Sequence, residues 1–428
     1  MDVTDEVRCA YILPKKGRRC KMLVKKGKKY CGEHEVHDDG NEHRIYCPND
    51  PKHTVCETRL AEHLKKCNAR TPNDPWVGIG LNSSTITSDS NIYLYFYGCR
   101  NRKFRFERRQ PIAFEICTTS FTATFASDTE VSPDFLIERI HLTYSSIIDK
   151  LYNWIGCGTD VCNELVGSSI TSFNKIRQKQ LLQHFAIIGC AMRAGLITNE
   201  NELCIVDFGS GKAELPYWIS KKFEKCRFLL LDNKGENPGI CMERVRCSIE
   251  HFDMSKIKTV KEAKRVVGIS KHLCGQATDW SINCIQNSLN NNVNIIGFAL
   301  TPCCHHKSTY AEYVGKAFLS SVGFVAEQHF QLLKYIASWA VCGFSSDPSR
   351  KAVDQNKLTE VQSKNTLKKM ENLTNEEKQV LGRKAKVLLE FGRAKHIQEF
   401  GYDVKLCQYV DLEISPENLL IIGKKKPF

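Results

Sequence analysis

The sequence predicts an α/β fold in which helices cover both faces of a mostly parallel sheet, preceded by two small modules held together by metal ions. From residue 203 onward, short apolar runs alternate with helical segments, which is typical of parallel strands buried on both faces. The first 70 residues are rich in Cys and His but have few long apolar runs. A glycine turn follows the first apolar run and opens a helix, as in nucleotide-binding α/β folds.

Two sets of Cys and His near the N-terminus have the spacing of zinc ligands. Structural zinc sites use four Cys or His ligands in a tetrahedron. A segment without a conventional core can fold around such an ion, which contributes on the order of 10 kcal/mol. The first set is spaced Cys-x10-Cys-x10-Cys-x2-His and the second Cys-x5-His-x9-His-x3-Cys; they are Cys9, Cys20, Cys31 and His34, and Cys47, His53, His63 and Cys67.

A helix expected over Glu57–Lys66 places His63 one turn before Cys67 on the same face. Three further side chains of suitable type lie nearby and could replace a ligand in either set. These are Cys56, His37 and His43.

The charge of the first module indicates a nucleic-acid partner. Between Arg8 and Tyr30 the chain has ten Lys or Arg and no Asp or Glu, and the whole chain has a formal charge of +13. A solvated charged loop has a similar composition. Interleaving of the positive charges with metal ligands favours phosphate contacts instead.

The sequence also constrains the compartment. No stretch approaches the ~18 apolar residues of a membrane span. The N-terminus lacks the basic and apolar regions of a signal peptide, so we expect a cytoplasmic or nuclear protein with no membrane partner. In such a reducing compartment the 21 cysteines are expected as thiols.

Composition divides the chain into four stretches. Residues 1–36 and 44–70 are the two zinc modules, residues 71–173 a linker and accessory region of unassigned role, and residues 174–428 the α/β domain. In the accessory region, aromatic and β-branched residues predict strands at Asn91–Tyr97 and Ile112–Phe125. A helix begins at Ser132-Pro133 and extends to about Leu151.

The domain begins with a helix from about Asn174, its expected N-cap, to Leu196. Thr374 and Glu377 form a capping box that follows a polar insert at 344–376 and opens a helix to about Phe400. The expected strands are Leu203–Asp207, Phe228–Asp232, Val245–Ile249, Val266–Ser270 and Asn294–Leu300, with Leu406–Leu412 and Asn418–Gly423 as a closing pair.

The turn after the first strand predicts a binding site for S-adenosylmethionine. Asp207 ends that strand, and Gly209 and Gly211 permit a tight turn that lets a ligand approach the backbone. The turn lacks the third glycine of dinucleotide sites, and the acid before it suits a ligand with a cationic amino-acid part. Asp232, at the end of the next strand, is placed to accept hydrogen bonds from ribose hydroxyls.

Three further blocks carry a family resemblance. They are Ser270–Asp279 (SKHLCGQATD), Thr301–His306 (TPCCHH) and Ser338–Gly343 (SWAVCG). With the zinc modules in front, they resemble the eukaryotic tRNA methyltransferases that modify the 2′-hydroxyl of nucleotide 4 in the acceptor stem. The resemblance covers residues 9–70 and about 174–425. It implies a Rossmann-like class I methyltransferase sheet, S-adenosylmethionine, zinc and a tRNA partner, and says nothing about protein partners.

The chain departs from that family in two places. Residues 83–131 have no counterpart. In the third strand the family usually carries an acid suited to the adenine amino group, where this chain has Ser248. Glu250 or Asp253 could substitute for it.

The catalytic prediction concerns the proton of the acceptor hydroxyl. Lys271 follows the fourth strand, at the edge where such sheets bind ligands, and would lower the pKa of the hydroxyl or take its proton. His272 and His305 are alternative bases. Two other functions remain open: cytosine-C5 methylation with Cys303 as the nucleophile, and RNA binding by a chain without catalytic activity.

Overall fold

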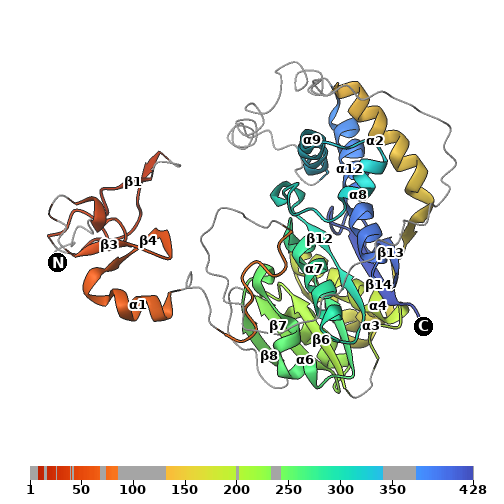
Figure 1. Cartoon of the computed structure of the whole chain (residues 1–428), viewed down its shortest axis with the longest axis horizontal. Coiled ribbons are helices and arrows are strands. Elements are labelled where there is room, and N and C mark those ends of the chain that lie inside the picture. Colours follow the sequence, from red (N-terminus) through yellow and green to blue (C-terminus); the bar gives the residue numbers. More distant parts are fainter. Residues whose placement is uncertain are drawn as a thin grey trace, which may run out of the picture. The chain divides into compact units, whose positions relative to one another are not determined.

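The computed structural model describes residues 8–13, 17–25, 27–38, 40, 43–67, 74–84, 132–198, 202–232, 242–340 and 373–427. They belong to two units, residues 1–75 and residues 76–428 (Figure 1). The strands predicted at Asn91–Tyr97 and Ile112–Phe125, and most of the predicted polar insert, lie outside the described residues. None of the described helices is both long enough and apolar enough to cross a membrane.

The first unit consists of two hairpins and one helix around its cysteines. Three cysteine side chains form the buried centre of the first hairpin, with Tyr11, Val24 and Tyr30 packed against them. Both hairpins are antiparallel. The elements are β1 (Ile12–Leu13), β2 (Arg18–Arg19), η1 (Glu35–His37), β3 (Arg44–Cys47), β4 (Asp50–Cys56), η2 (Glu57–Arg59) and α1 (Leu60–Lys66).

The second unit is built on an eight-stranded sheet in the order β5-β13-β14-β11-β9-β6-β7-β8. The run from β8 through β11 is parallel, whereas β14 is antiparallel to both of its neighbours. This sheet confirms the predicted Rossmann-like methyltransferase fold. Its strands are β5 (Leu151–Asn153), β6 (Leu203–Phe208), β7 (Arg227–Asp232), β8 (Met242–Arg246), β9 (Arg265–Ile269), β11 (Ile295–Leu300), β13 (Tyr402–Gln408) and β14 (Leu419–Lys425).

Three predicted boundaries were wrong. The strand expected at Leu406–Leu412 is β13, which begins at Tyr402 and ends at Gln408. The third strand was expected at Val245–Ile249, but β8 ends at Arg246, and Ile249 is buried in η5 (Ile249–His251) instead. The helix that begins at Pro133 ends at Ile147, and Leu151 opens the edge strand β5 after the short helix η3 (Ile148–Lys150). In all three places apolar residues continue past the end of the element, so the pattern alone placed that end too late.

Helices cover both faces of the sheet because the central strands carry apolar residues on both sides. In β6, Leu203 and Ile205 face one hydrophobic layer, while Val206 and Phe208 face the other. The first layer contains α3 (Thr159–Leu165), α4 (Lys175–Arg193) and α5 (Glu214–Lys222). The second contains α2 (Pro133–Ile147), α6 (Lys258–Lys261), α7 (Ala277–Asn290), α8 (Lys316–Ser321), α9 (Glu327–Ser338) and α12 (Asn375–Gln398).

The predicted helix caps are confirmed. The Asn174 side chain accepts a hydrogen bond from the backbone N–H of Arg177 at 2.9 Å. Thr374 and Glu377 make both hydrogen bonds of a capping box at the start of α12. That helix packs against α2, α8 and α9, as Figure 1 shows. Three short helices complete the list: η4 (Gly167–Ser172), η6 (Met254–Lys256) and η7 (His305–Lys307).

Part of the predicted accessory region belongs to the second unit. Val77 forms a bridge with Phe252. The fully buried Asn82 donates two side-chain hydrogen bonds, to the carbonyl oxygens of Ile249 at 2.6 Å and Phe252 at 2.8 Å. The segment at 76–84 therefore packs against the loop that follows β8. The boundary between the two units lies before Trp76.

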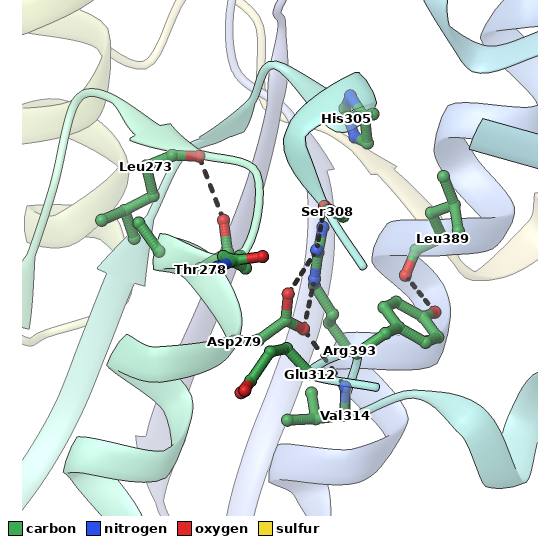
Figure 2. Close-up of polar contacts among 12 residues, drawn as sticks. Leu273, Thr278, Asp279, His305, Ser308, Glu312, Val314, Leu389 and Arg393 are labelled. Atoms are coloured by element: carbon green, nitrogen blue, oxygen red, sulfur yellow. Dashed lines mark hydrogen bonds and ion pairs between the residues drawn. The ribbon is translucent and has the colours of Figure 1, made fainter. Parts of the chain in front are cut away.

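A buried network of charges joins α7, α12 and the loop after β11 (Figure 2). Arg393 donates from Nε to Asp279 at 2.9 Å, from Nη2 to Asp279 at 2.7 Å, and from Nη1 to Glu390 at 2.5 Å. The second partner of Glu390 is His305 Nε2 at 2.7 Å. Burial disfavours the charge on Glu390, but Arg393 and His305 outweigh it and lower the pKa of that carboxyl.

Removing one charge of this network should strongly destabilise the second unit. The Asp279→Asn substitution leaves the guanidinium of Arg393, which is 1 % exposed, without its bidentate partner. We expect the free energy of unfolding to fall by about 3–5 kcal/mol, the usual cost of an uncompensated buried charge. Urea unfolding followed by fluorescence measures it.

The exposed Asp149 offers a matched control, since Asp149→Asn should change the unfolding free energy by less than ~0.5 kcal/mol. A loss below ~1 kcal/mol for Asp279→Asn would mean that the network contributes little to stability.

Candidate active site and metal centres

The donor atoms of the first predicted zinc set lie together. The Nδ1 atom of His34 lies 3.5 Å from Cys9 Sγ and 3.3 Å from Cys31 Sγ. All four donors, including Cys20 Sγ, lie within 4.8 Å of one another. Tetrahedral zinc with Cys and His ligands separates its donor atoms by about 3.3–3.8 Å. The cluster therefore has the dimensions of a zinc site.

The donor atoms of the second set also lie together. Here the histidines present Nε2, whereas His34 presents Nδ1. The Nε2 atoms of His53 and His63 lie 3.2 Å apart. Cys47 Sγ lies 3.2 Å from His63 Nε2 and 3.6 Å from Cys67 Sγ. Cys47 ends β3, His53 lies on β4, and α1 carries His63 and stops at Cys67. Two strands and one helix thus present four ligands to one point.

The three spare side chains belong to neither donor cluster. The thiol of Cys56 interacts with the Thr58 hydroxyl at 3.1 Å. The ring of His37 stacks on Tyr11, with ring centroids 4.5 Å apart. His43 accepts a backbone hydrogen bond from Glu57 through its carbonyl oxygen at 2.7 Å.

In the second unit, the glycine turn lies where the strand order reverses. The chain runs outward from β6 to β8 and returns to β9 on the other side of β6, and such reversals form ligand crevices at the carboxyl ends of the strands. Gly209 has φ 73° and Gly211 φ 50°, which favour glycine. A Cβ on Gly209 would lie 3.2 Å from the carbonyl oxygen of His272. The turn thus approaches the loop that carries Lys271.

Two carboxyl groups flank this turn. Asp207 is 3 % exposed, and burial together with the nearby Asp232 raises its pKa well above the ordinary value, while Arg244 opposes the shift. Asp232 accepts a hydrogen bond from the backbone N–H of Gly211 at 2.7 Å. The positive charge near Asp207 therefore does not offset its burial. Asp232 holds the turn in place through its hydrogen bond.

Arg244, which the sequence did not indicate as a site residue, reaches the turn from β8. Its guanidinium donates to Ser210 Oγ at 3.2 Å and to the carbonyl oxygen of Gly211 at 3.1 Å. No local motif marks this arginine, because its role depends on β7 lying between β8 and β6.

A second group of titratable side chains surrounds Lys271. This lysine is half-buried, and desolvation lowers its pKa, with Glu214 opposing the shift and Arg177 adding to it. Arg177 and Glu214 form an ion pair at 2.5 Å. His272 is exposed, yet partial desolvation and the adjacent Lys271 lower its pKa as well.

His184, on α4, belongs to the same group and was not singled out from the sequence. It is 3 % exposed. Burial, followed by the charges of Lys271 and Arg177, lowers its pKa to about 3. A histidine inside an amphipathic helix gives no signal that it faces a loop almost ninety residues later.

The remaining predicted residues lie outside the group around Lys271. His305 is 3 % exposed and bonded to Glu390 in the buried charge network, an environment that gives a substrate no access. Glu250 lies in η5, after β8, with its side chain 3.9 Å from His251. Asp253 caps η6, where its carboxylate accepts from Ser255, so its oxygens are engaged locally.

Comparison with known proteins identifies families for both units. The family described as Methyltransferase TRM13 matches residues 182–424. A CCCH zinc finger in TRM13 protein matches residues 7–35, and a U11-48K-like CHHC zinc finger matches residues 44–68.

Curated relatives match along nearly the whole chain. A human protein named tRNA:m(4)X modification enzyme TRM13 homolog is 28% identical, with 97% of this chain and 94% of that protein covered. A Saccharomyces cerevisiae protein named tRNA:m(4)X modification enzyme TRM13 is 24% identical, with 99% and 97% covered. A solved structure of the plantazolicin methyltransferase BpumL aligns with 69% of the chain and 98% of its own at 12% identity, but its TM-score of 0.30 is too low to bear on fold or function.

The zinc sets make a prediction about metal content. The Cys67→Ser substitution removes one of four converging donors, so the full-length protein should lose one equivalent of bound zinc after dialysis against a weak chelator. Atomic absorption measures the loss. Cys56→Ser, at the neighbouring thiol outside the cluster, should keep the wild-type content, and an equal loss in both variants would contradict the ligand set.

The burial of His184 makes a prediction about acid stability. Its pKa is about 3 in the folded chain against 6.5 for the free side chain. The preference for the neutral ring is fully present above pH 6.5 and is lost as the pH falls towards 3, so this residue contributes a slope of at most ~1.4 kcal/mol per pH unit between those values. His184→Gln, which cannot take up a proton, should flatten the fall of unfolding free energy between pH 6.5 and 4.5.

Urea unfolding at several pH values provides the measurement. An unchanged slope in His184→Gln would show that its ring titrates normally in the folded chain.

Proposed function

This chain belongs to the TRM13 methyltransferase family, and from that premise we propose that it transfers a methyl group from S-adenosylmethionine to the ribose 2′-hydroxyl of nucleotide 4 in the acceptor stem of a tRNA. The names of the relatives, tRNA:m(4)X modification enzymes, support the tRNA and its position 4. The observation that carries the chemistry is a half-buried lysine of lowered pKa, Lys271, beside the glycine turn at the reversal of strand order.

The residues around the turn fit S-adenosylmethionine, which when bound supplies a methyl group on a positively charged sulfur. Asp207, whose burial is not offset by nearby positive charge, suits the ammonium group of the amino-acid part. Gly209 and Gly211 let a ligand come close to the backbone, and a Cβ at Gly211 would meet no atom within 4 Å. We assign Asp232 to the ribose hydroxyls and Glu250, in η5 after β8, to the adenine amino group.

Lys271 is the base that we assign to the acceptor hydroxyl. A ribose hydroxyl is a weak nucleophile at neutral pH, so a side chain must remove its proton or stabilise the developing charge. Desolvation lowers the pKa of Lys271 and so increases the fraction of neutral amine that can accept a proton. His272 remains the alternative base because its pKa is also lowered and its ring is exposed. The buried bond of His305 to Glu390 argues against a role for it in proton transfer.

The buried position of Cys303 weighs against cytosine-C5 methylation. A nucleophile in that reaction must reach the base, but Cys303 is 4 % exposed and its Sγ lies 3.4 Å from Cys274 Sγ. A non-catalytic RNA-binding chain would not need a lysine of lowered pKa at the same reversal of strand order as two strand-end carboxyls.

We assign zinc binding to the eight clustered donors of the first unit and tRNA backbone contacts to its basic surface. Arg18, Arg19 and Lys21 are exposed on or next to β2. Lysine and arginine side chains on a metal-stabilised module suit phosphates of a helical stem, which proteins recognise by shape and backbone.

Replacing Lys271 should separate transfer from binding. For Lys271→Ala we expect a fall in kcat of at least ~100-fold, because general-base contributions are about 10²–10⁴-fold. The affinity for S-adenosylmethionine, measured by calorimetry, should stay within about twofold of the wild type. Lys271→Arg should not restore activity, since a guanidinium does not lose its proton near neutral pH.

Lys264 provides the control because it precedes the start of β9, whereas Lys271 follows the end of that strand. Lys264→Ala should retain wild-type kcat. Labelled methyl transfer to total tRNA, followed by nucleoside mass spectrometry and site mapping, identifies the product. Turnover retained by Lys271→Ala would remove this lysine from the reaction, and a methylated base instead of a methylated ribose would contradict the proposed acceptor.

A further inference from the structure

Three cysteines from two separate loops converge beside the candidate active site. Cys274 ends the short strand β10 (Leu273–Cys274), and Cys303 ends β12 (Pro302–Cys303), with which β10 pairs in parallel. Cys304 is the next residue. The Sγ atoms of Cys274 and Cys303 lie 3.4 Å apart, and all three sulfur atoms lie within 4.8 Å of one another.

The convergence depends on an unusual backbone conformation. Successive residues of an extended strand point to opposite faces, so Cys303 and Cys304 would normally point apart. Cys304 instead has φ 52° and ψ 47°, a left-handed conformation that costs a non-glycine residue about 1–2 kcal/mol. Its backbone N–H donates to Glu417 Oε1 at 3.3 Å, which helps to hold the turn.

The loop that carries Cys274 is also held in place by close contacts. The Gly275 N–H donates to the carbonyl oxygen of Cys303 at 2.8 Å. A Cβ on Gly275 would lie 2.6 Å from Lys307 Cβ, so no larger residue fits between the loops. The two segments are therefore in close contact at the position where the three sulfur atoms converge.

The arrangement fits a metal ion better than a disulfide or simple packing. A disulfide needs two sulfur atoms and gives no reason for the third to turn inwards. Buried thiols that only fill space, such as Cys204 and Cys284, are at most 1 % exposed, whereas Cys274 and Cys304 are half-buried and leave a path for an ion. Sulfur ligands of tetrahedral zinc lie about 3.8 Å apart.

We propose that Cys274, Cys303 and Cys304 bind a third zinc ion, separate from the two in the first unit. Within the described part of the chain this donor group has three members, so the fourth position is left for water or another small ligand. The ion would tie the loop after β9, which carries Lys271 and His272, to the loop after β11. Its role would be to position Lys271, and the inference does not depend on the tRNA acceptor proposed above.

Metal analysis of the full-length protein tests the proposal. Protein purified with a non-chelating reductant should contain three zinc ions per chain by inductively coupled plasma mass spectrometry. Cys303→Ser and Cys304→Ser should each contain two, because a site reduced to two thiolates holds zinc weakly. Cys284→Ser, at a buried thiol of α7 outside the cluster, should contain three.

Three further measurements test the proposal, and the first two do not depend on the folding of a variant. The wild type needs no substitution, and a content of two zinc ions per chain, unchanged after incubation with excess zinc and dialysis, would overturn the proposal. Intact mass under non-reducing conditions would also overturn it if it showed the loss of two hydrogens with peptide mapping to Cys274 and Cys303. Cobalt substitution should add a third set of sulfur-to-cobalt charge-transfer bands that Cys304→Ser lacks.

Discussion

The pairing of Arg393 with Asp279 joins α12 to α7 within one helical layer of the second unit. Both side chains are fully or almost fully buried, and 114 residues of chain separate them. Through Glu390 the same guanidinium reaches His305, so one charged group fixes α7, α12 and the loop after β11. Buried charges are costly unless every partner is present. Loss of one partner from this network should therefore cost far more stability than loss of an exposed ion pair.

Burial also dominates the electrostatics of the candidate active site. Desolvation shifts each of its key groups towards the neutral form: the pKa of Asp207 is raised, and those of Lys271, His272 and His184 are lowered. In the Arg393 network burial likewise raises the pKa of Asp279, but Arg393 forms ion pairs with Asp279 and Glu390, and the pKa of Glu390 is lowered. A site prepared in this way gains most from a ligand that brings its own charge, and a lysine of lowered pKa is suited to accept a proton. The same fold thus separates charges that stabilise it from charges that are available for chemistry.

The first unit reaches stability by a different route. Its buried centre consists largely of cysteine side chains with a few neighbours packed against them, too small to offset the entropy of ordering the segment. Metal coordination supplies the missing free energy because each ion fixes four points of the chain at once. This leaves the exterior free to carry many positive charges without disturbing a hydrophobic core.

The sequence by itself determined the features that depend on local spacing. The zinc ligand sets, the caps at Asn174 and Thr374, the strands β6, β7, β9 and β11, and the acids beside the glycine turn all follow from residues close together in the chain. Tertiary structure decided the rest. Arg244 at the turn, His184 beside Lys271 and Cys274 against Cys303 come together only when strand order and helix orientation are set. It also decided where β8 ends, because an edge strand is defined by pairing with its neighbour and not by its apolar residues. Contacts between distant segments leave no periodic signal, since burial selects residue type but does not identify the partner.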